Sequence, residues 1–294
     1  MNNTVFIRSK ISIFTISFVR ILSLLPFILV GIYLNTFKIN NINPSAFLKP
    51  LTYAFVGLII GILVNLIFTK RNKKDKLNDI LFSSFHIEYG VILGCLMSPS
   101  VSLITFSITL LILFIISKLI DIKINAMALS FIIIYLITKY TTSFNLVERI
   151  ATSDKDYLIG NITGSLLSTG FISYLIALFI LRVNSSSKTD ISIYASITFA
   201  ILTLIASFLV DESFYELVFI NSYLFIFLYV ASDSISSSYT LKGVKIYGIL
   251  IGLITFSLMF ITPILAPFIA ILITSLFSTV IDKLSNKLLK KKLT

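Results

Sequence analysis

Long apolar runs separated by short polar loops extend along almost the whole chain. Most of the runs have about 18–25 residues, the length that a helix needs to cross a hydrocarbon core of about 30 Å. They cover residues 11–34, 51–69, 80–97, 101–120, 124–137, 158–181, 191–210, 215–230, 244–261 and 264–281. The runs lack the alternation of barrel strands, so they predict an all-α, polytopic membrane protein with about ten transmembrane helices.

The loops between the runs predict the orientation. When the N-terminus is placed inside, 18 of the 24 Lys and Arg residues fall in inner segments and five in outer ones, while Arg20 lies within the first run. Cytoplasmic loops are enriched in Lys and Arg, so both termini are expected in the cytoplasm. The run at 124–137 is short, but omitting it would place the basic tail outside. We expect a single membrane domain, residues 1–294, with 1–140 and 158–294 as candidate halves.

The composition agrees with a bilayer as solvent. Hydrophobic residues make up 57% of the chain and charged residues 13%, against about 25% charged in soluble domains. The net charge of +11 follows the loop pattern, so no nucleic acid is expected as a partner. The first apolar run can span a membrane and lacks a small-residue cleavage site, so it does not read as a cleavable signal peptide.

Cys95 and His86 are the only cysteine and the only histidine. A disulfide, an iron–sulfur cluster, a Cys-based zinc site and a bis-His haem therefore cannot be built within this chain. The sequence also lacks a P-loop, an HExxH motif and a nucleophile elbow, which argues against hydrolytic enzymes. No metal site is predicted.

Two polar segments each admit two interpretations. Residues 158–170 (LIGNITGSLLSTG) hold Gly160 and Gly164 at a spacing suited to close helix packing, or they form a helix N-terminus that faces an anionic cofactor. Residues 232–245 (SDSISSSYTLKGVK) bind a phosphate or flavin through their hydroxyls, with Gly243 allowing close approach, or they form a turn in which Asp233 or a Ser caps the next helix.

Ionisable residues within apolar runs are candidates for function, because a charge in a membrane is costly unless it has a role. Arg20 lies in the first run, and His86 and Glu88 lie in the third. Arg20 suits a side chain that snorkels to the inner surface, whereas Glu88 suits a protein-lined site. Two residues apart on a helix, His86 and Glu88 point about 200° apart and are not expected in one site.

The order of several motifs resembles the family of homologous membrane subunits shared by the Rnf electron-transport complex and the Na⁺-translocating NADH:quinone oxidoreductase. The motifs are Ile7-Arg8-Ser9 with Leu24-Leu25-Pro26, Asn78-Asp79 with Met97-Ser98-Pro99, Gly160-Asn161-Ile162-Thr163-Gly164-Ser165, and Ala231-Ser232-Asp233 with Lys242-Gly243, Gly248, Gly252 and Ile281-Asp282. Ten helices with both ends inside agree with the topology of that family.

The resemblance implies a flavin-holding subunit of an Rnf-like complex in a bacterial cell membrane. Its electron transfer would be coupled to movement of Na⁺ or H⁺, with FMN or riboflavin as cofactor and the other subunits as partners. The implied site residues are Thr152 as the covalent anchor, Asn161, Thr163 and Ser165 around an outer flavin, Asp233, Ser236 and Thr240 around an inner one, and Glu88 for ion handling.

The chain also departs from the family pattern. Of the S-G-A-T flavin-attachment sequence only Ala151-Thr152 remains, preceded by Arg149 and Ile150, and the Gly-rich segment before the fifth helix is replaced by residues 118–129 (KLIDIKINAMAL). Two alternatives therefore stay open, a transporter of a small solute and a flavin-free scaffold subunit of such a complex.

Overall fold

The structure is a computed structural model that describes residues 12–33, 44–69, 84–98, 101–119, 124–139, 147–148, 163–164, 170–184, 187–208, 217–218 and 222–293. Apart from one antiparallel bridge, in which β1 (Val147–Glu148) pairs with β2 (Thr163–Gly164), the described elements are helices. The predicted all-α class is confirmed.

Each of the ten predicted runs contains a described helix. The first five hold α1 (Ile13–Leu22) and α2 (Leu25–Tyr33), α3 (Pro44–Phe68), α5 (His86–Leu96), α6 (Leu103–Leu119) and α7 (Ala126–Lys139). The last five hold α9 (Phe171–Val183), α10 (Thr189–Ser207), α12 (Tyr223–Ile226) with the π-helix η2 (Phe227–Ala231), α13 (Leu241–Met259), and α14 (Ala266–Leu276), after which α15 (Ser278–Leu293) follows.

Among the described residues, four helical segments are long and apolar enough to cross a membrane: Ile13–Ile32, Leu51–Phe68, Thr189–Ser207 and Leu241–Met259. The bent pair of α14 and α15 would make a fifth, and α5, α6, α7 and α9 are shorter apolar helices of 10–17 residues. Together these helices make the chain a multi-pass membrane protein.

The first run is broken rather than continuous. α1 ends before Ser23 and Leu24, which form a turn, and α2 starts with Pro26 at its second position. Proline is compatible with a first helical turn but cannot donate the backbone bond that a continuous helix needs there. The Ser23 hydroxyl donates to the carbonyl oxygen of Arg20 (2.7 Å), which satisfies one acceptor at the break.

The sixth run differs most from the prediction. We expected a span from residue 158, but Thr163 and Gly164 form strand β2 and the helix begins only at Phe171. The prediction that Gly160 and Gly164 form one small-residue pair on a helix is therefore wrong for Gly164, and Gly160 lies outside the described residues. Gly and Thr have low helix propensities, which agrees with a strand at Thr163 and Gly164.

Glycines allow unusually close helix contacts in two places. Gly57 and Gly61 of α3 face α5, where a Cβ on Gly90 would lie 2.6 Å from the carbonyl carbon of Gly57. On α13, a Cβ on Gly252 would lie 2.7 Å from the carbonyl oxygen of Ala195 in α10. Small residues spaced by four drive such contacts in membranes, because lipid supplies no hydrophobic force between helices.

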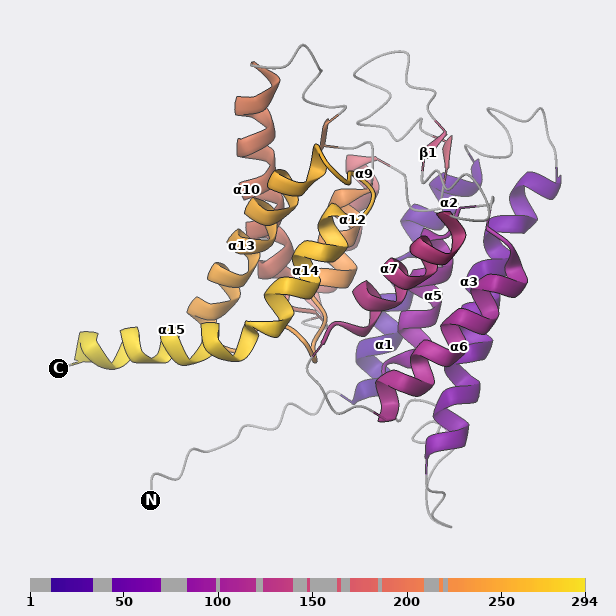
Figure 1. Ribbon diagram of the computed structural model, residues 1–294, viewed down its shortest axis with the longest axis horizontal. Helices are drawn as coiled ribbons and strands as arrows, with labels where there is room; N and C mark the ends of the chain where they lie inside the picture. Colours follow the sequence, from indigo (N-terminus) through magenta and orange to yellow (C-terminus); the bar gives the residue numbers. More distant parts are fainter. Residues whose placement is uncertain are drawn as a thin grey trace.

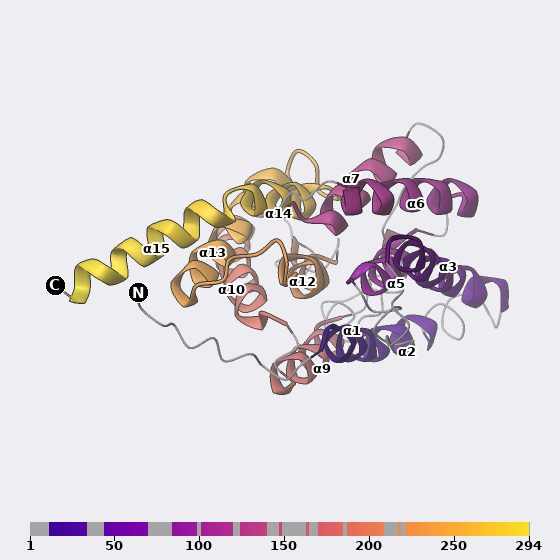
Figure 2. The same cartoon turned by 90° about the horizontal axis from the view of Figure 1, so that it is seen from below.

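Two short helices are buried along their full length. Every residue of α5 is buried, and so is every residue of α12 and η2. Figure 2 shows α5 between α1, α3 and α7, and α12 between α9, α10 and α14. Buried polar groups on these two helices therefore face protein instead of lipid.

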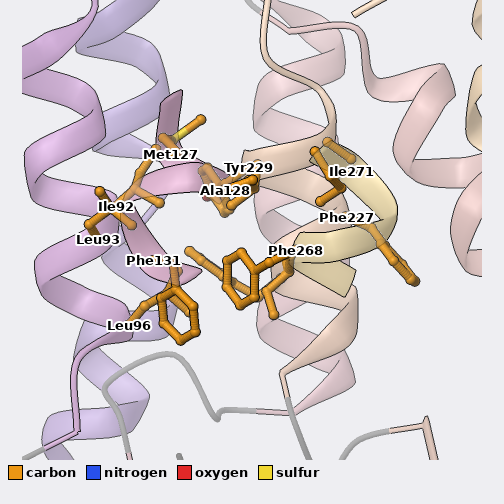
Figure 3. Packing of buried hydrophobic residues seen from close by; sticks show 14 of the residues in the cluster. Ile92, Leu93, Leu96, Met127, Ala128, Phe131, Phe227, Tyr229, Phe268 and Ile271 are labelled. Atoms are coloured by element: carbon orange, nitrogen blue, oxygen red, sulfur yellow. The ribbon is translucent and has the colours of Figure 1, made fainter. Parts of the chain in front are cut away.

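The candidate halves of the chain, residues 1–140 and 158–294, meet along several helix pairs. α1 and α2 contact α9, and α7 contacts α14. Figure 3 shows the second contact, where the Phe131 and Phe268 rings stack with centroids 3.8 Å apart. The division into two halves stays a prediction.

The last predicted run ends in a sharp bend. α14 and α15 meet at Phe277 with an angle of 54° between them. α15 runs sideways at the same end of the bundle at which α1 begins (Figure 1). The two ends of the described chain thus lie at one end of the bundle, as the predicted cytoplasmic termini require.

Candidate functional site

A buried ion pair joins the first and third runs. The Arg20 Nη1 atom lies 2.9 Å from Oε1 of Glu88, and both side chains are fully buried. Arg20 therefore does not snorkel to the surface, as its place in the first run suggested. Glu88 does occupy a protein-lined position, in agreement with the prediction.

The π-helix η2 supplies the neighbouring acceptor. Nη2 of Arg20 donates a hydrogen bond to the carbonyl oxygen of Tyr229 in η2. The hydroxyl of Tyr229 lies 2.8 Å from Oγ of Ser23. A π-helix departs from the regular i to i−4 pattern and often occurs at functional sites. Here it presents a backbone carbonyl to a buried guanidinium.

The ion pair leaves hydrogen-bonding capacity unused. Among the described residues, neither carboxylate oxygen of Glu88 accepts a hydrogen bond of good geometry, although the fully buried Ser17 hydroxyl lies beside the carboxylate, and Nε and Nη1 of Arg20 make none. The contact between the two is thus an ion pair without hydrogen-bond geometry. A buried carboxylate usually accepts several hydrogen bonds, so Glu88 retains the capacity to bind a proton or a cation.

A second carboxylate, Asp233, lies just beyond η2 and is 2% exposed. Its Oδ1 accepts a hydrogen bond from the Tyr89 hydroxyl (2.6 Å). Its Oδ2 accepts bonds from the backbone N–H (2.9 Å) and the hydroxyl (2.7 Å) of Ser236. The Asp233 carboxylate therefore has three donors, in contrast to Glu88.

Asn125 connects the start of α7 with this loop. Its side-chain amide donates to the carbonyl oxygen of Val230 (2.8 Å) and to Oγ of Ser236 (3.1 Å). Its Oδ1 accepts from the N–H of Ala128 (2.9 Å), so Asn125 also caps α7. One buried amide thus joins two distant parts of the chain.

A cavity of about 160 Å³ opens beside Asp233, between the end of α6 and the start of α7. Its polar wall consists of His86, Tyr89, Ser117, Ser130 and Asp233, and the rest of the lining is apolar. Since the loop between α6 and α7 is predicted to be cytoplasmic, the cavity gives Asp233 a route toward that side.

His86 faces α6 and not Glu88. Its Nε2 lies 3.0 Å from Oγ of Ser117, and its ring meets Phe114 edge to face with centroids 5.1 Å apart. Nδ1 lies 2.6 Å from Oγ of Ser84. The prediction that His86 and Glu88 belong to different sites is confirmed.

Lys188 holds the segment 232–240 in place through hydrogen bonds and a cation–π contact. Nζ of Lys188 donates to Oγ of Ser237 (2.9 Å) and to the carbonyl oxygen of Ser238 (3.0 Å). The same atom lies 3.9 Å from the centre of the Tyr239 ring, a cation–π distance. These contacts hold the segment that carries Asp233.

Asp282 of α15 fixes the other end of this segment. Its carboxylate accepts bonds from the Ser238 hydroxyl (2.5 Å), the backbone N–H of Tyr239 (3.1 Å), and the N–H (3.0 Å) and hydroxyl (2.9 Å) of Thr240. Partial burial by itself would raise the pKa of Asp282, but these donors hold it below its ordinary value.

Thr240 and Gly243 serve the turn at the start of α13. The Thr240 hydroxyl accepts from the N–H of Gly243 (3.1 Å) and so caps α13. A Cβ on Gly243 would lie 2.7 Å from Oδ1 of Asp282. The close approach that Gly243 allows is therefore to the protein itself. Thr240 belongs to the Asp282 contacts, whereas Asp233 and Ser236 belong to the buried network.

The predicted outer flavin residues fall largely beyond the described ranges. Thr152, Asn161 and Ser165 lie outside the described residues, and Thr163 is described only as part of the backbone of β2. β2 pairs Thr163 with Glu148 of β1, four residues before Thr152. The outer site remains a prediction.

Sequence reasoning did not single out Tyr89 or the role of Asn125. Tyr89 directly follows Glu88, but a lone tyrosine in an apolar run carries no signal of its hydrogen bond to a residue 144 positions away. Asn125 lies in the segment 118–129, which the sequence marked only as a departure from the family pattern. In the described part of the chain, no group of three or more His, Cys, Asp and Glu side chains could hold a metal ion.

Comparison with known proteins identifies the family of this chain. The model of the NQR2, RnfD, RnfE family matches residues 121–290, which is more than half of the chain. The matched region includes Asn125, Asp233 and Asp282, while Arg20 and Glu88 precede it. No curated protein matches the chain. The family match confirms the resemblance seen in the motifs, and the chain belongs to the NQR2, RnfD, RnfE family.

Proposed function

We propose that this membrane subunit of an Rnf- or NQR-type complex binds a proton or a sodium ion at Glu88 and couples its passage to flavin-mediated electron transfer. The observation that carries the proposal is the fully buried Glu88 carboxylate, whose oxygens lack a hydrogen bond of good geometry from the described residues and which has the Ser17 hydroxyl beside it as a further oxygen ligand. The Arg20 guanidinium is its one charged partner there.

The charges around η2 support this function. Arg20 contributes one positive charge, while Glu88 and Asp233 contribute two negative ones when ionised. Burial of an uncompensated charge in a membrane protein costs several kcal/mol, so such residues pair or bind ions. The cluster lacks one positive charge, which a proton or a monovalent cation supplies.

The cavity beside Asp233 supports access from the predicted cytoplasmic side. It is lined by the two groups that share a hydrogen bond, Tyr89 and Asp233. Its polar wall can hold water, which needs two to four polar partners. Tyr89 lies in the wall of this cavity, and Glu88 is the residue directly before it in α5.

The same cavity limits where a flavin binds. A cavity of about 150 Å³ holds a benzene molecule, and the one beside Asp233 has about 160 Å³. It accepts one aromatic ring but not the three-ring flavin system. Of the three predicted inner residues only Asp233 lines this cavity, and the inner flavin site at Asp233, Ser236 and Thr240 stays a prediction.

We place the proposed flavin, FMN or riboflavin, in the outer loop. Thr152 would anchor it through its phosphate, and Asn161, Thr163 and Ser165 would surround it. When bound, a flavin supplies one- and two-electron transfer, and the protein supplies position and access.

Calorimetry on the purified protein tests the ion site. Titration with NaCl at pH 8, in two buffers of different ionisation enthalpy, measures Na⁺ binding and any proton released. We expect heat in the wild type, its loss in Glu88→Gln, and its retention in Asp190→Asn, whose carboxylate forms an exposed ion pair with Arg182. Sodium-independent proton uptake that is lost in Glu88→Gln would identify H⁺ instead. If the wild type shows neither Na⁺ binding nor proton uptake, ion handling at Glu88 is contradicted.

In-gel fluorescence tests the flavin separately. The chain is co-expressed with a flavin transferase, denatured and examined on a gel, and Thr152→Ala is treated in the same way. Fluorescence that disappears in the variant supports covalent FMN at Thr152. If the denatured protein is dark and the native protein releases no flavin, the flavin-free scaffold or the small-solute transporter replaces the redox function.

A further inference from the structure

Helix α15 contacts the bundle along a single face. Ser278, Ile281 and Ser285 are buried, with exposed fractions of 3%, 6% and 0%. They lie three and four residues apart and so share one side of the helix with Asp282. Beyond this contact α15 extends past the neighbouring helices, as Figures 1 and 2 show.

Another face of α15 presents apolar side chains. Val280 is 47% exposed and Leu284, one turn later, is 57% exposed. Nearby on the same end of the bundle, Leu241 at the start of α13 is 85% exposed and Tyr239 is 58% exposed. We call these four residues the apolar strip. The exposed apolar surface of the strip would be unfavourable in water.

Positive charge accompanies the apolar strip. Lys283 is exposed between Val280 and Leu284, and Lys245 is exposed on α13. The remaining turns of α15 contain Lys287, Lys290, Lys291 and Lys292 in sequence, and no acidic residue follows Asp282. After Asp282, α15 therefore combines apolar residues with lysines, and it contains no other charged residue type.

We propose that α15 lies in the head-group layer of the membrane and binds anionic phospholipids there. The 54° bend turns α15 away from the α14 direction, near the end of α13 that Leu241 begins (Figure 1). A helix that exposes apolar side chains beside lysines lies in this layer, because acyl chains cover the apolar groups while the long lysine side chains reach anionic head groups.

An acidic protein partner is the other candidate occupant. Such a partner would match the lysines, but it would leave Val280 and Leu284 without a reason to be exposed at the edge of the bilayer. The lipid surface explains both features together. This inference concerns α15 alone and stands whether or not the chain handles ions or flavin.

The absence of tryptophan from the sequence gives a clean test. We would prepare Leu284→Trp and Asn286→Trp separately in the full chain and reconstitute each into vesicles. Both positions are exposed, and they point about 200° apart on the helix. The vesicles contain either brominated phosphatidylcholine or brominated phosphatidylglycerol at the same mole fraction, since bromine quenches tryptophan at short range.

We expect Leu284→Trp to emit at shorter wavelength than Asn286→Trp. Brominated phosphatidylglycerol should quench the fluorescence of Leu284→Trp about twofold more than brominated phosphatidylcholine does, because the lysines raise the local concentration of anionic lipid around α15. About 0.5 M salt should remove this difference by screening the charges. Changing Lys283, Lys287, Lys290, Lys291 and Lys292 to Gln should remove the difference at low salt as well. Val280→Trp repeats the test if Leu284→Trp does not fold.

Two results would overturn the inference. Equal quenching by the two lipids at low salt would show that α15 does not select anionic lipid. Emission like that of Asn286→Trp, with no quenching by either lipid, would place α15 in water and leave an acidic protein as its occupant.

Discussion

The Tyr89 hydroxyl donates a 2.6 Å hydrogen bond to Oδ1 of Asp233, so the residue next to Glu88 in α5 is bound to the segment that follows η2. The two carboxylates of the cluster are thereby connected through adjacent residues of one helix. A change in the protonation of either carboxylate alters the charge that both helices bury.

Removal of the Tyr89 hydroxyl should weaken this connection. Tyr89→Phe leaves Asp233 with its Ser236 donors and removes one charge-assisted bond, worth roughly 1.5–3 kcal/mol. We expect faster hydrogen exchange at residues 233–236, measured by mass spectrometry. Tyr135→Phe, a change of the same chemistry in α7, is the control and should leave that exchange unchanged.

The Arg20–Glu88 pair should be more costly to break than to replace. Arg20→Met or Glu88→Leu leaves one buried charge alone, and each should lower the free energy of unfolding by roughly 3–5 kcal/mol. The double variant should recover much of that loss. Cys95, the single and fully buried cysteine, reports unfolding through a thiol-reactive dye during heating.

A double variant no more stable than the single ones would contradict this account of the pair. The exposed pair of Arg182 and Asp190, with N–O separation of 3.6 Å, provides the comparison. Arg182→Met should change the melting temperature little, because exposed ion pairs contribute about 0–1 kcal/mol.

Gly90→Ala should separate α5 from α3. Its new methyl group would lie 2.6 Å from the carbonyl carbon of Gly57, and backbone atoms on both helices would have to move. We expect a loss of roughly 1–3 kcal/mol, as for overpacked cores. The dye assay at Cys95 measures it, and Leu66→Ala on the exposed side of α3 should have a smaller effect.

Asp282 should make stability depend on acid pH. Because its folded-state pKa is lowered, its contribution is fully present above the unfolded-state pKa, about 3.9, and is lost as the pH falls through the folded-state value. Circular dichroism melts from pH 7 to pH 3 should show Asp282→Asn less stable than the wild type near neutrality, by roughly 1 kcal/mol or more.

The difference between Asp282→Asn and the wild type should shrink toward pH 3. The comparison isolates this carboxylate from the others that titrate in the same range. A constant difference at all pH values would mean that the carboxylate charge does not stabilise the contacts with Ser238 and Thr240.

Helix positions were largely predictable from the sequence, and the site was not. Apolar runs locate helices because lipid demands internally bonded backbones, which is why α10 and α13 lie close to their predicted bounds. In the sixth run the prediction was wrong at Thr163 and Gly164, which form a strand, because the apolar content of the run outweighed the low helix propensity of these residues. Arg20 and Glu88 were visible as ionisable residues, but their pairing depends on how distant helices pack.

Other parts of the site depend on local geometry that carries no simple signal. No motif predicts that η2 is a π-helix. Its carbonyl oxygens at Tyr229 and Val230 accept hydrogen bonds from the side chains of Arg20 and Asn125. Asp233 was singled out by resemblance and as a candidate cap of the next helix, but the structure gives the cap of α13 to Thr240, and the partner of Asp233, Tyr89, was not singled out. Thr240 shared the same polar segment yet serves the contact with Asp282.

The burial of α5 has a consequence for biosynthesis. α5 has 11 residues and carries Glu88, so alone it would neither reach both membrane surfaces nor tolerate lipid. α3, with 25 residues, is synthesised first and presents Gly57 and Gly61 to it. The ribosome therefore delivers the polar helix only after its docking partner exists, and the two have to enter the bilayer as a hairpin.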